Sequence, residues 1–213
     1  MKNGLLTRSI FFILGLLLVA LGNALTILSG EGNGIWTATS LSLATLTKLP
    51  LNWVIILVGL LVIVANVLLL DHFSWYHLAG SVLFVFFFGE FIQLFVHQLA
   101  FLKDSFSSDF EKNFLVVFGI VIVCLGTSFY QRANLWMYPT DYLTDILALR
   151  FFSGSVFKGQ LLAFVPALLI ICSAFLATGH LIGIQIGTVL ALLANGELIG
   201  FFHRYAFPVL KHN

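Results

Sequence analysis

Long apolar segments alternate with short polar breaks along the whole chain. Six apolar segments are close to the roughly 20 residues that a membrane-spanning helix needs, and two shorter ones follow polar breaks. The long helices are predicted at 10–29, 53–70, 78–100, 114–131, 157–177 and 181–202, and the short ones at 35–47 and 139–151. A helix of about 13 residues reaches roughly 20 Å, which is less than the roughly 30 Å hydrocarbon core of a membrane.

Two stretches of the chain resemble each other and indicate an internal repeat. The segment FGEFIQLF returns as NGELIGFF, and its glutamates, Glu90 and Glu197, lie 107 residues apart (197 − 90). A Leu-Gly pair at 21–22 returns at 125–126, an offset of 104 residues. Self-similarity of this kind predicts two tandem four-element repeats. Within a single membrane domain, 1–213, we expect repeat 1 at about 8–101, a solvated linker at 102–113 and repeat 2 at about 114–206.

The short segments determine how the two repeats are oriented. If each spans the membrane together with the polar break before it, every repeat has four crossings and the two repeats are parallel. If each is re-entrant, every repeat has three crossings and the repeats are inverted. With a cytoplasmic N-terminus, the first arrangement places nine of the ten Lys and Arg residues inside and Arg132 outside, whereas the second gives seven inside and three outside. The parallel repeat is therefore favoured, with the inverted repeat as the alternative, and both termini are predicted to be cytoplasmic.

Composition excludes a soluble protein. Hydrophobic residues make up 60% of the 213 residues and charged residues 9%, with a mean hydropathy of +1.06, against about 45–50% and 25% in soluble domains. The 10 basic and 9 acidic residues nearly cancel, so there is no basic surface for a nucleic acid. No hydrolase, metalloprotease or phosphate-loop motif occurs, and both cysteines lie in apolar runs. We expect an all-α, polytopic helical membrane protein that is not an enzyme and has no metal or cofactor.

Acidic residues in apolar surroundings are the candidates for function. A carboxylate near the centre of a membrane costs at least about 2.5 to 3.5 kcal/mol, so Glu90 and Glu197 are expected to be paired, protonated or in contact with water. Asp141 and Asp145 lie four residues apart on one helical face. The predicted substrate- or proton-binding residues are Trp36, Thr37, Glu90, Tyr138, Asp141, Tyr142, Asp145 and Glu197. The alternatives are structural: the glutamates hydrogen-bond neighbouring helices, Asp141 caps the short helix, and Asp145 pairs with a basic neighbour such as Arg132.

The short segments also carry a family resemblance. Pro139-Thr140-Asp141 opens the second short segment and Ile35-Trp36-Thr37 opens the first, after a Gly-rich break. Together with the Leu-Gly pair that precedes each break, this pattern resembles the YczE/YitT-like bacterial membrane proteins, in which a Pro-Trp-Asp-like tripeptide opens a short helix. The resemblance covers most of the chain. It implies a multi-pass protein of the bacterial inner (plasma) membrane, a presumed transporter, and no catalytic residues.

These observations predict a secondary transporter or permease. Its substrate would be a small molecule that binds between the two repeats, and the acidic and aromatic candidates favour a cationic one. The first alternative is a non-transporting scaffold or regulator in the membrane. The second is the substrate-binding subunit of a larger transport complex. The expected partners are the lipid bilayer, a small-molecule substrate, and an oligomer or partner subunit, with no nucleic acid.

Overall fold

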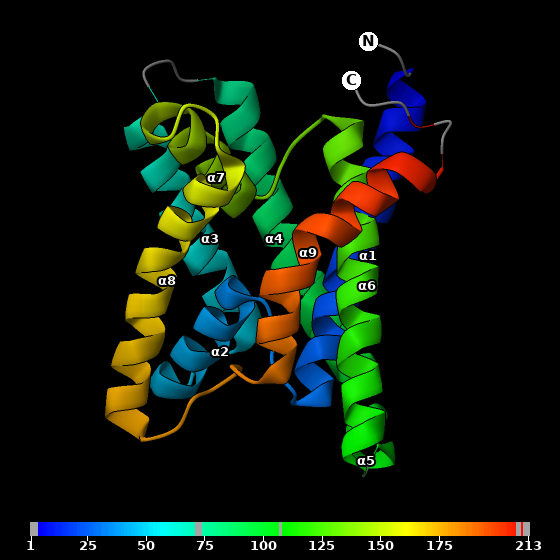
Figure 1. Ribbon diagram of the computed structural model, residues 1–213, viewed down its shortest axis with the longest axis vertical. Helices are drawn as coiled ribbons and strands as arrows, with labels where there is room; N and C mark the ends of the chain where they lie inside the picture. Colours follow the sequence, from blue (N-terminus) through cyan, green and yellow to red (C-terminus); the bar gives the residue numbers. More distant parts are fainter. Residues whose placement is uncertain (1–3, 71–73, 107, 208–209, 211–213) are drawn as a thin grey trace. The chain divides into compact units, whose positions relative to one another are not determined.

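The computed structural model describes residues 4–70, 74–106, 108–207 and 210, and no strand occurs among them. Helices follow one another with short connections (Figure 1). They are α1 (Leu5–Ser29), α2 (Ile35–Thr47), α3 (Leu51–Leu69), α4 (Trp75–Gln98), α5 (Phe101–Ser105), α6 (Asp109–Ala133), α7 (Pro139–Phe151), α8 (Val156–Thr178) and α9 (Ile186–Tyr205). The predicted all-α fold class is confirmed.

Six of these helices are long and apolar enough to cross a membrane: α1, α3, α4, α6, α8 and α9. They correspond to the six long predicted segments, with ends shifted by a few residues. The helices α2 and α7 have 13 residues each and begin and end where the sequence predicts. The chain is therefore a multi-pass membrane protein, and the favoured count of eight crossings needs two more spans than its long helices provide.

Two boundaries differ from the prediction for local reasons. The predicted linker loop, 102–113, contains most of α5 and the start of α6. Helix α6 begins at Asp109 because the Ser108 hydroxyl accepts a hydrogen bond from Glu111 N at 3.3 Å while Ser108 N donates to the Glu111 carboxylate at 3.1 Å, which is a capping box. Helix α9 begins only at Ile186, because Gly183, which lies inside the predicted segment 181–202, has a φ of +72° that an α-helix cannot contain.

The chain divides into two compact units, and neither coincides with one sequence repeat. Unit 1 comprises residues 1–34, 90–135 and 183–213, and unit 2 comprises 35–89 and 136–182. Among the described residues, unit 1 contains α1, α5, α6, α9 and the last third of α4. Unit 2 contains α2, α3, α7, α8 and the rest of α4. Each unit therefore draws helices from both predicted repeats.

In unit 1, α1 and α6 lie side by side and run antiparallel (Figure 1). Their backbones touch at two glycine pairs, Gly15 with Gly126 and Gly22 with Gly119. A Cβ atom added to Gly15 would lie 2.7 Å from the carbonyl oxygen of Gly126, and one added to Gly22 would lie 2.6 Å from that of Gly119. A parallel repeat requires its two first helices to run in the same direction. The antiparallel pair therefore fits the inverted alternative and does not fit the arrangement that the charge count favoured.

Two buried arginine side chains hold the C-terminal end of α6 in unit 1. The Arg132 side chain is buried, and it donates hydrogen bonds from Nε to Ser128 O at 3.2 Å and from Nη1 to Leu210 O at 3.1 Å. Arg8 is also buried and donates to Ala133 O at 2.6 Å from Nε. The two guanidinium groups thus bind backbone carbonyls around the C-terminal end of α6.

The Gly-rich break after α1 is a buried connection in unit 1. Asn33 N donates to Gly183 O at 2.9 Å, and Gly187 N donates to Glu31 O at 2.7 Å. The Thr26 hydroxyl lies 2.8 Å from the Asn33 side-chain oxygen. The two backbone bonds attach the break to the segment that leads into α9, and they satisfy the buried groups that they join without water.

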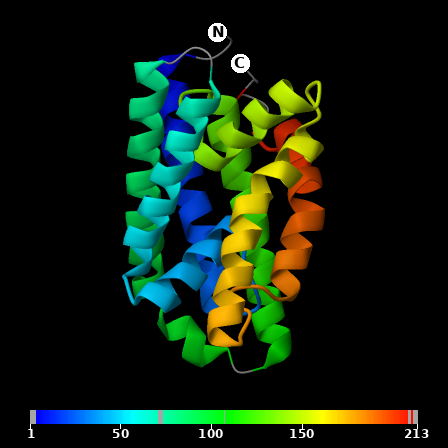
Figure 2. The same ribbon diagram turned by 90° about the vertical axis from the view of Figure 1, so that its left-hand side faces the viewer.

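In unit 2, α2 and α7 lie at opposite ends of α8, as two views show (Figure 1, Figure 2). The Thr39 hydroxyl of α2 lies 3.4 Å from Ala167 O in the middle of α8, and the Ser42 hydroxyl donates to Ile182 O at 3.3 Å, beyond the end of α8. At the other end, Gly159 of α8 packs closely on α7, because a Cβ there would meet Thr144 O at 2.5 Å. Each short helix thus covers about half the length of α8.

Candidate functional site

The depth at which α7 begins is set by aromatic contacts with α4. The Tyr138 ring lies 4.8 Å from the ring of Phe88 and 5.6 Å from that of Phe84, both in the middle third of α4. Further along α7, the Arg150 guanidinium donates a hydrogen bond to Leu69 O, at the end of α3. Helix α7 therefore begins beside the middle of a membrane-spanning helix and ends at the level where another one ends.

The sequence around Pro139 explains why a helix starts at this depth. Tyr138 is the N-cap residue with extended backbone, and Pro139 occupies the first turn, where its missing N–H leaves no unsatisfied donor. Asp141 adds a negative charge in the same turn, which stabilises the helix N-terminus. From α3, the buried Asn66 side chain donates from Nδ2 to Pro139 O at 2.8 Å. A side chain of another helix thus holds the beginning of α7 in place.

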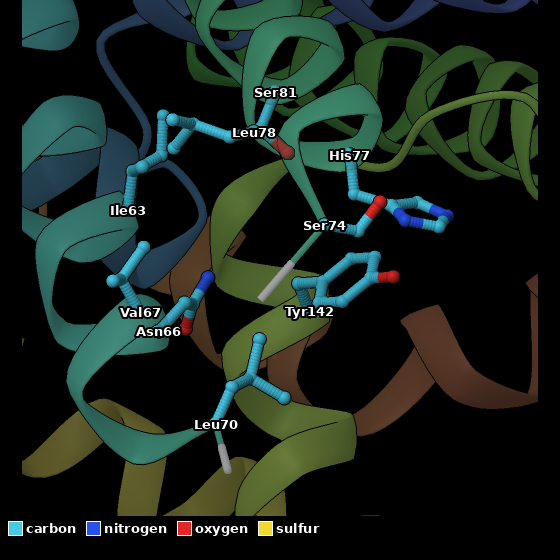
Figure 3. Close-up of a pocket in the computed structure, with 9 residues that line it drawn as sticks. All are labelled: Ile63, Asn66, Val67, Leu70, Ser74, His77, Leu78, Ser81 and Tyr142. Carbon is cyan, nitrogen blue, oxygen red and sulfur yellow. The ribbon is translucent and has the colours of Figure 1, made fainter. Parts of the chain in front are cut away.

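A pocket of about 130 Å³ lies where α3, α4 and α7 meet in unit 2. Figure 3 shows the Tyr142 side chain from α7 near Ser74 and His77, with Asn66 and Val67 from α3, and Leu70 directly after it, also around the pocket. The Tyr142 ring lies 6.0 Å from the His77 ring. The lining residues are Ile63, Asn66, Val67, Leu70, Ser74, His77, Leu78, Ser81 and Tyr142.

The described lining combines apolar walls with polar groups. Three hydroxyls, one imidazole and one carboxamide face a wall of Ile, Val and Leu side chains, and no Asp, Glu, Lys or Arg is among these nine residues. The Oδ1 atom of Asn66 is buried and has no hydrogen-bond partner among the described residues. An unsatisfied buried acceptor is costly, so this oxygen reduces the stability of the packing around the start of α7.

The structure divides the predicted site residues between the two units. Six belong to unit 2, namely Trp36, Thr37, Tyr138, Asp141, Tyr142 and Asp145, and two belong to unit 1, namely Glu90 and Glu197.

The residues in unit 2 have different surroundings. Tyr142 lines the pocket and Tyr138 packs on the α4 phenylalanines, whereas Trp36 packs on an apolar cluster that includes Val62 and Leu147. Asp141 is half-buried and Asp145 exposed. Of the six, Tyr142 is the one that lines the described pocket.

The two glutamates differ from each other in exposure. Glu90 is half-buried in α4, whereas Glu197 is exposed on α9. Arg132, given above as an example of a basic neighbour for Asp145, donates hydrogen bonds to backbone carbonyls of its own unit.

Sequence reasoning missed most of the residues that line the pocket. Asn66, Ser74, His77 and Ser81 were not among the candidates. One signal was available, because Asn66 is a polar residue within the apolar run 53–70 and a carboxamide there needs a partner. His77 and Ser74 lie at the start of α4 and have no comparable signal.

A family model for a family of unknown function, DUF6198, matches residues 6–204. The chain belongs to this family. No curated protein and no solved structure matches the chain. Membership of DUF6198 covers every membrane-spanning helix and both short helices and carries no stated activity. The resemblance to the YczE/YitT-like proteins stays a prediction.

Proposed function

We propose that this chain is a membrane permease for a small molecule, and that its two repeats are inverted. The observation that carries the proposal is the place of α7, a 13-residue helix that begins beside the middle of α4 and ends level with the end of α3. Half-helices that begin at mid-membrane are a recurrent feature of transporter substrate sites. Irregular backbone at that depth is tolerated where it is buried in protein or lines a cavity.

The helix boundaries support the repeat. Helices α1 and α6 have 25 residues each, and α2 and α7 have 13 each. All four boundaries of the first pair of helices recur in the second pair at an offset of 104 residues (109 − 5, 133 − 29, 139 − 35 and 151 − 47). The same offset was found from the Leu-Gly pairs in the sequence.

The glycine contacts support inversion. The offset of 104 relates Gly15 to Gly119 and Gly22 to Gly126. In unit 1, Gly15 contacts Gly126 and Gly22 contacts Gly119. Such a reciprocal exchange is the signature of a two-fold axis between the partners. Because the helices are antiparallel, that axis is perpendicular to them and lies in the plane of the membrane, as in inverted-repeat transporters.

Cysteine labelling in intact cells tests the inverted topology. Three crossings in each repeat put the α5 segment and the turn between α7 and α8 on opposite sides of the membrane, whereas four crossings put both on the same side. Ser105→Cys and Ser153→Cys are suitable because both residues are exposed, and the background is a variant without Cys124 and Cys172. We expect an impermeant maleimide to modify position 105 and not position 153 until the membrane is permeabilised. Equal labelling of the two positions would rule out the inverted repeat.

Solute exchange in proteoliposomes tests the permease function. The purified chain is reconstituted and screened with radiolabelled small neutral, cationic and anionic solutes, with protein-free liposomes as the reference. We expect protein-dependent exchange of at least one solute class and its loss in Val67→Phe, which fills the pocket between α3, α4 and α7. The control is Val64→Phe, one turn earlier on α3 and exposed. Binding without any protein-dependent exchange would contradict transport and favour a non-transporting membrane protein.

A further inference from the structure

We infer that helix α8 bends at Pro166, and that this bend separates the short helices α2 and α7 during transport. The inference rests on the proposed function, since it names a movement that the permease uses. Three observations support it: a proline in the middle of α8, a different short helix bound on either side of that proline, and a poor helix former at the equivalent position of α3.

Pro166 removes a hydrogen bond from the middle of α8. It is the eleventh of the 23 residues of this helix (166 − 155). Proline has no N–H to donate to the carbonyl oxygen four residues earlier, that of Leu162, and its ring also crowds that oxygen. Proline is for this reason a main cause of kinks in long helices. The side chain of Pro166 is exposed, so burial in the helix bundle does not account for it.

The two halves of α8 bind different short helices. Before the proline, Gly159 packs on α7, because an added Cβ atom would lie 2.5 Å from Thr144 O. After the proline, the Thr39 hydroxyl of α2 lies 3.4 Å from Ala167 O. A second hydroxyl of α2 bonds a carbonyl beyond the C-terminal end of α8. A bend at Pro166 therefore moves α7 with the first half of α8 and α2 with the second half.

The two short helices meet where such a bend would open. Trp36, in the first turn of α2, packs on an apolar cluster of α3, α7 and α8 side chains that includes Leu143 and Ala163. Apolar contacts are not directional, so these surfaces can part without leaving a hydrogen-bonding group unsatisfied. A bend at Pro166 would thus separate the first turn of α2 from α7 and uncover Trp36, one of the predicted site residues.

The first repeat also has a poor helix former at this position. The offset of 107 residues that relates Glu90 to Glu197 relates Gly59 of α3 to Pro166 of α8 (166 − 59). Glycine and proline are the two poorest helix formers. Gly59 is restrained by close packing, because an added Cβ atom would lie 2.5 Å from Val85 Cγ1 of α4. We therefore assign the hinge to α8 and expect α3 to stay straight.

Two substitutions at Pro166 separate a hinge from a packing role. Both Pro166→Ala and Pro166→Gly restore the missing N–H, but alanine is the best helix former and glycine a poor one. Spin labels at Leu46→Cys of α2 and Leu149→Cys of α7 report the separation of the short helices, because both positions are exposed. The background is a variant without Cys124 and Cys172. Distances are measured by pulsed electron resonance on the purified full chain in lipid nanodiscs.

We expect two label distances in the parent chain and in Pro166→Gly. In Pro166→Ala the population of the second distance should be roughly fivefold smaller or less, the effect of exchanging glycine for alanine inside a helix. The matched control is Val165→Ala, next to the proline and also exposed, which should behave as the parent chain. A single, identical distance in every protein would overturn the hinge. Two distances that persist unchanged in Pro166→Ala would place the movement elsewhere and overturn it as well.

The exchange assay tests whether transport uses the hinge, and it fails separately. Solute exchange in proteoliposomes should fall at least roughly fivefold in Pro166→Ala and persist in Pro166→Gly and Val165→Ala. Unchanged exchange in a Pro166→Ala protein that has lost the second distance would contradict a role of the hinge in transport and leave the permease function standing. Label distances that respond as expected, with no exchange of any solute by the parent chain, would contradict the permease function and leave the hinge standing.

Discussion

Replacing Gly22 with alanine should separate α1 from α6 and destabilise the protein. The Cβ atom of alanine would lie 2.6 Å from Gly119 O and 2.7 Å from Val123 N, both backbone atoms that cannot rotate away. Ordinary contact begins at 3.4 Å, so the helices must move apart locally by about 0.8 Å (3.4 − 2.6).

The expected cost follows from that separation. A gap of 0.5 to 1 Å already forfeits roughly a quarter to a half of each van der Waals contact along the interface, and glycine-mediated approach is a main source of helix association in membranes. Overpacking of a tight contact costs typically about 1–3 kcal/mol. We expect Gly22→Ala to lower the free energy of unfolding by this amount.

Reversible unfolding in mixed micelles of SDS and a mild detergent, followed by circular dichroism, measures the change. The control is Gly200→Ala in α9, where an added Cβ has nothing within 4 Å. Alanine there should be neutral or stabilising by up to about 1 kcal/mol, because glycine is the poorer helix former. If the two variants are equally stable, the close approach of α1 and α6 does not contribute to stability.

A double variant gives a sharper test of the same contact. In Gly22→Ala with Gly119→Ala, both Cβ atoms enter one gap between the helices, so the separation that relieves the first also relieves the second. The combined loss should be smaller than the sum of the single losses, a coupling typical of residues in direct contact. Strict additivity would place the two glycines in independent surroundings and would contradict the antiparallel contact.

Two further substitutions act through buried hydrogen bonds in unit 1. Arg132→Met keeps the helical bond to Ser128 O but removes the side-chain donor to Leu210 O, so we expect a loss of roughly 1–3 kcal/mol in the same unfolding assay and faster amide exchange at the C-terminus. Asn33→Ala removes one of two acceptors near the Thr26 hydroxyl, the other being Asn23 O at 2.9 Å, and should cost about 1 kcal/mol, whereas Asn33→Asp keeps that acceptor and should cost less.

Much of the fold follows from patterns in the sequence. The bounds of both short helices were predicted to the residue, because each lies between unambiguous breakers: a Gly-rich or proline start and a Lys-Leu-Pro or Ser-Gly end. The long helices were predicted with errors at their ends, where capping decides. Asp109 begins α6 through the capping box of Ser108 and Glu111, and that pattern, Ser-x-x-Glu, was visible in the sequence.

The candidate site was less predictable, because the sequence pattern indicates a function for acidic residues in apolar runs and not for uncharged polar residues near helix ends. Placing a carboxylate in an apolar run costs free energy, so such a residue predicts a partner or a function. The pocket, however, is lined by hydroxyls, an imidazole and a carboxamide, which are common near helix ends and give no signal alone. Their proximity arises from the place of α7, which begins beside the middle of α4 and brings Tyr142 beside His77, 65 residues earlier in the chain (142 − 77).

The orientation of the repeats shows why charge counting could not decide the topology. Both candidate arrangements place more basic residues inside than outside, nine against one and seven against three, so both satisfy the positive-inside tendency. The glycines were a second signal. Gly15 and Gly22 lie seven residues apart, two turns of helix, and so do Gly119 and Gly126, which places each pair on one face.

The two glycine pairs alone do not determine whether α1 and α6 run parallel or antiparallel, since glycine can contact glycine in either case. In a parallel pair related by a two-fold axis along the membrane normal, Gly15 would meet its own equivalent, Gly119. In an antiparallel pair it meets the equivalent of the other glycine, Gly126, and this is the contact that the structure contains. The relative direction of the two helices therefore decides which glycine each one touches, and that direction depends on the number of crossings in each repeat. A re-entrant α2 would make that number three, which is odd, so a re-entrant short helix and the glycine pairing would both agree with the inverted arrangement that we propose.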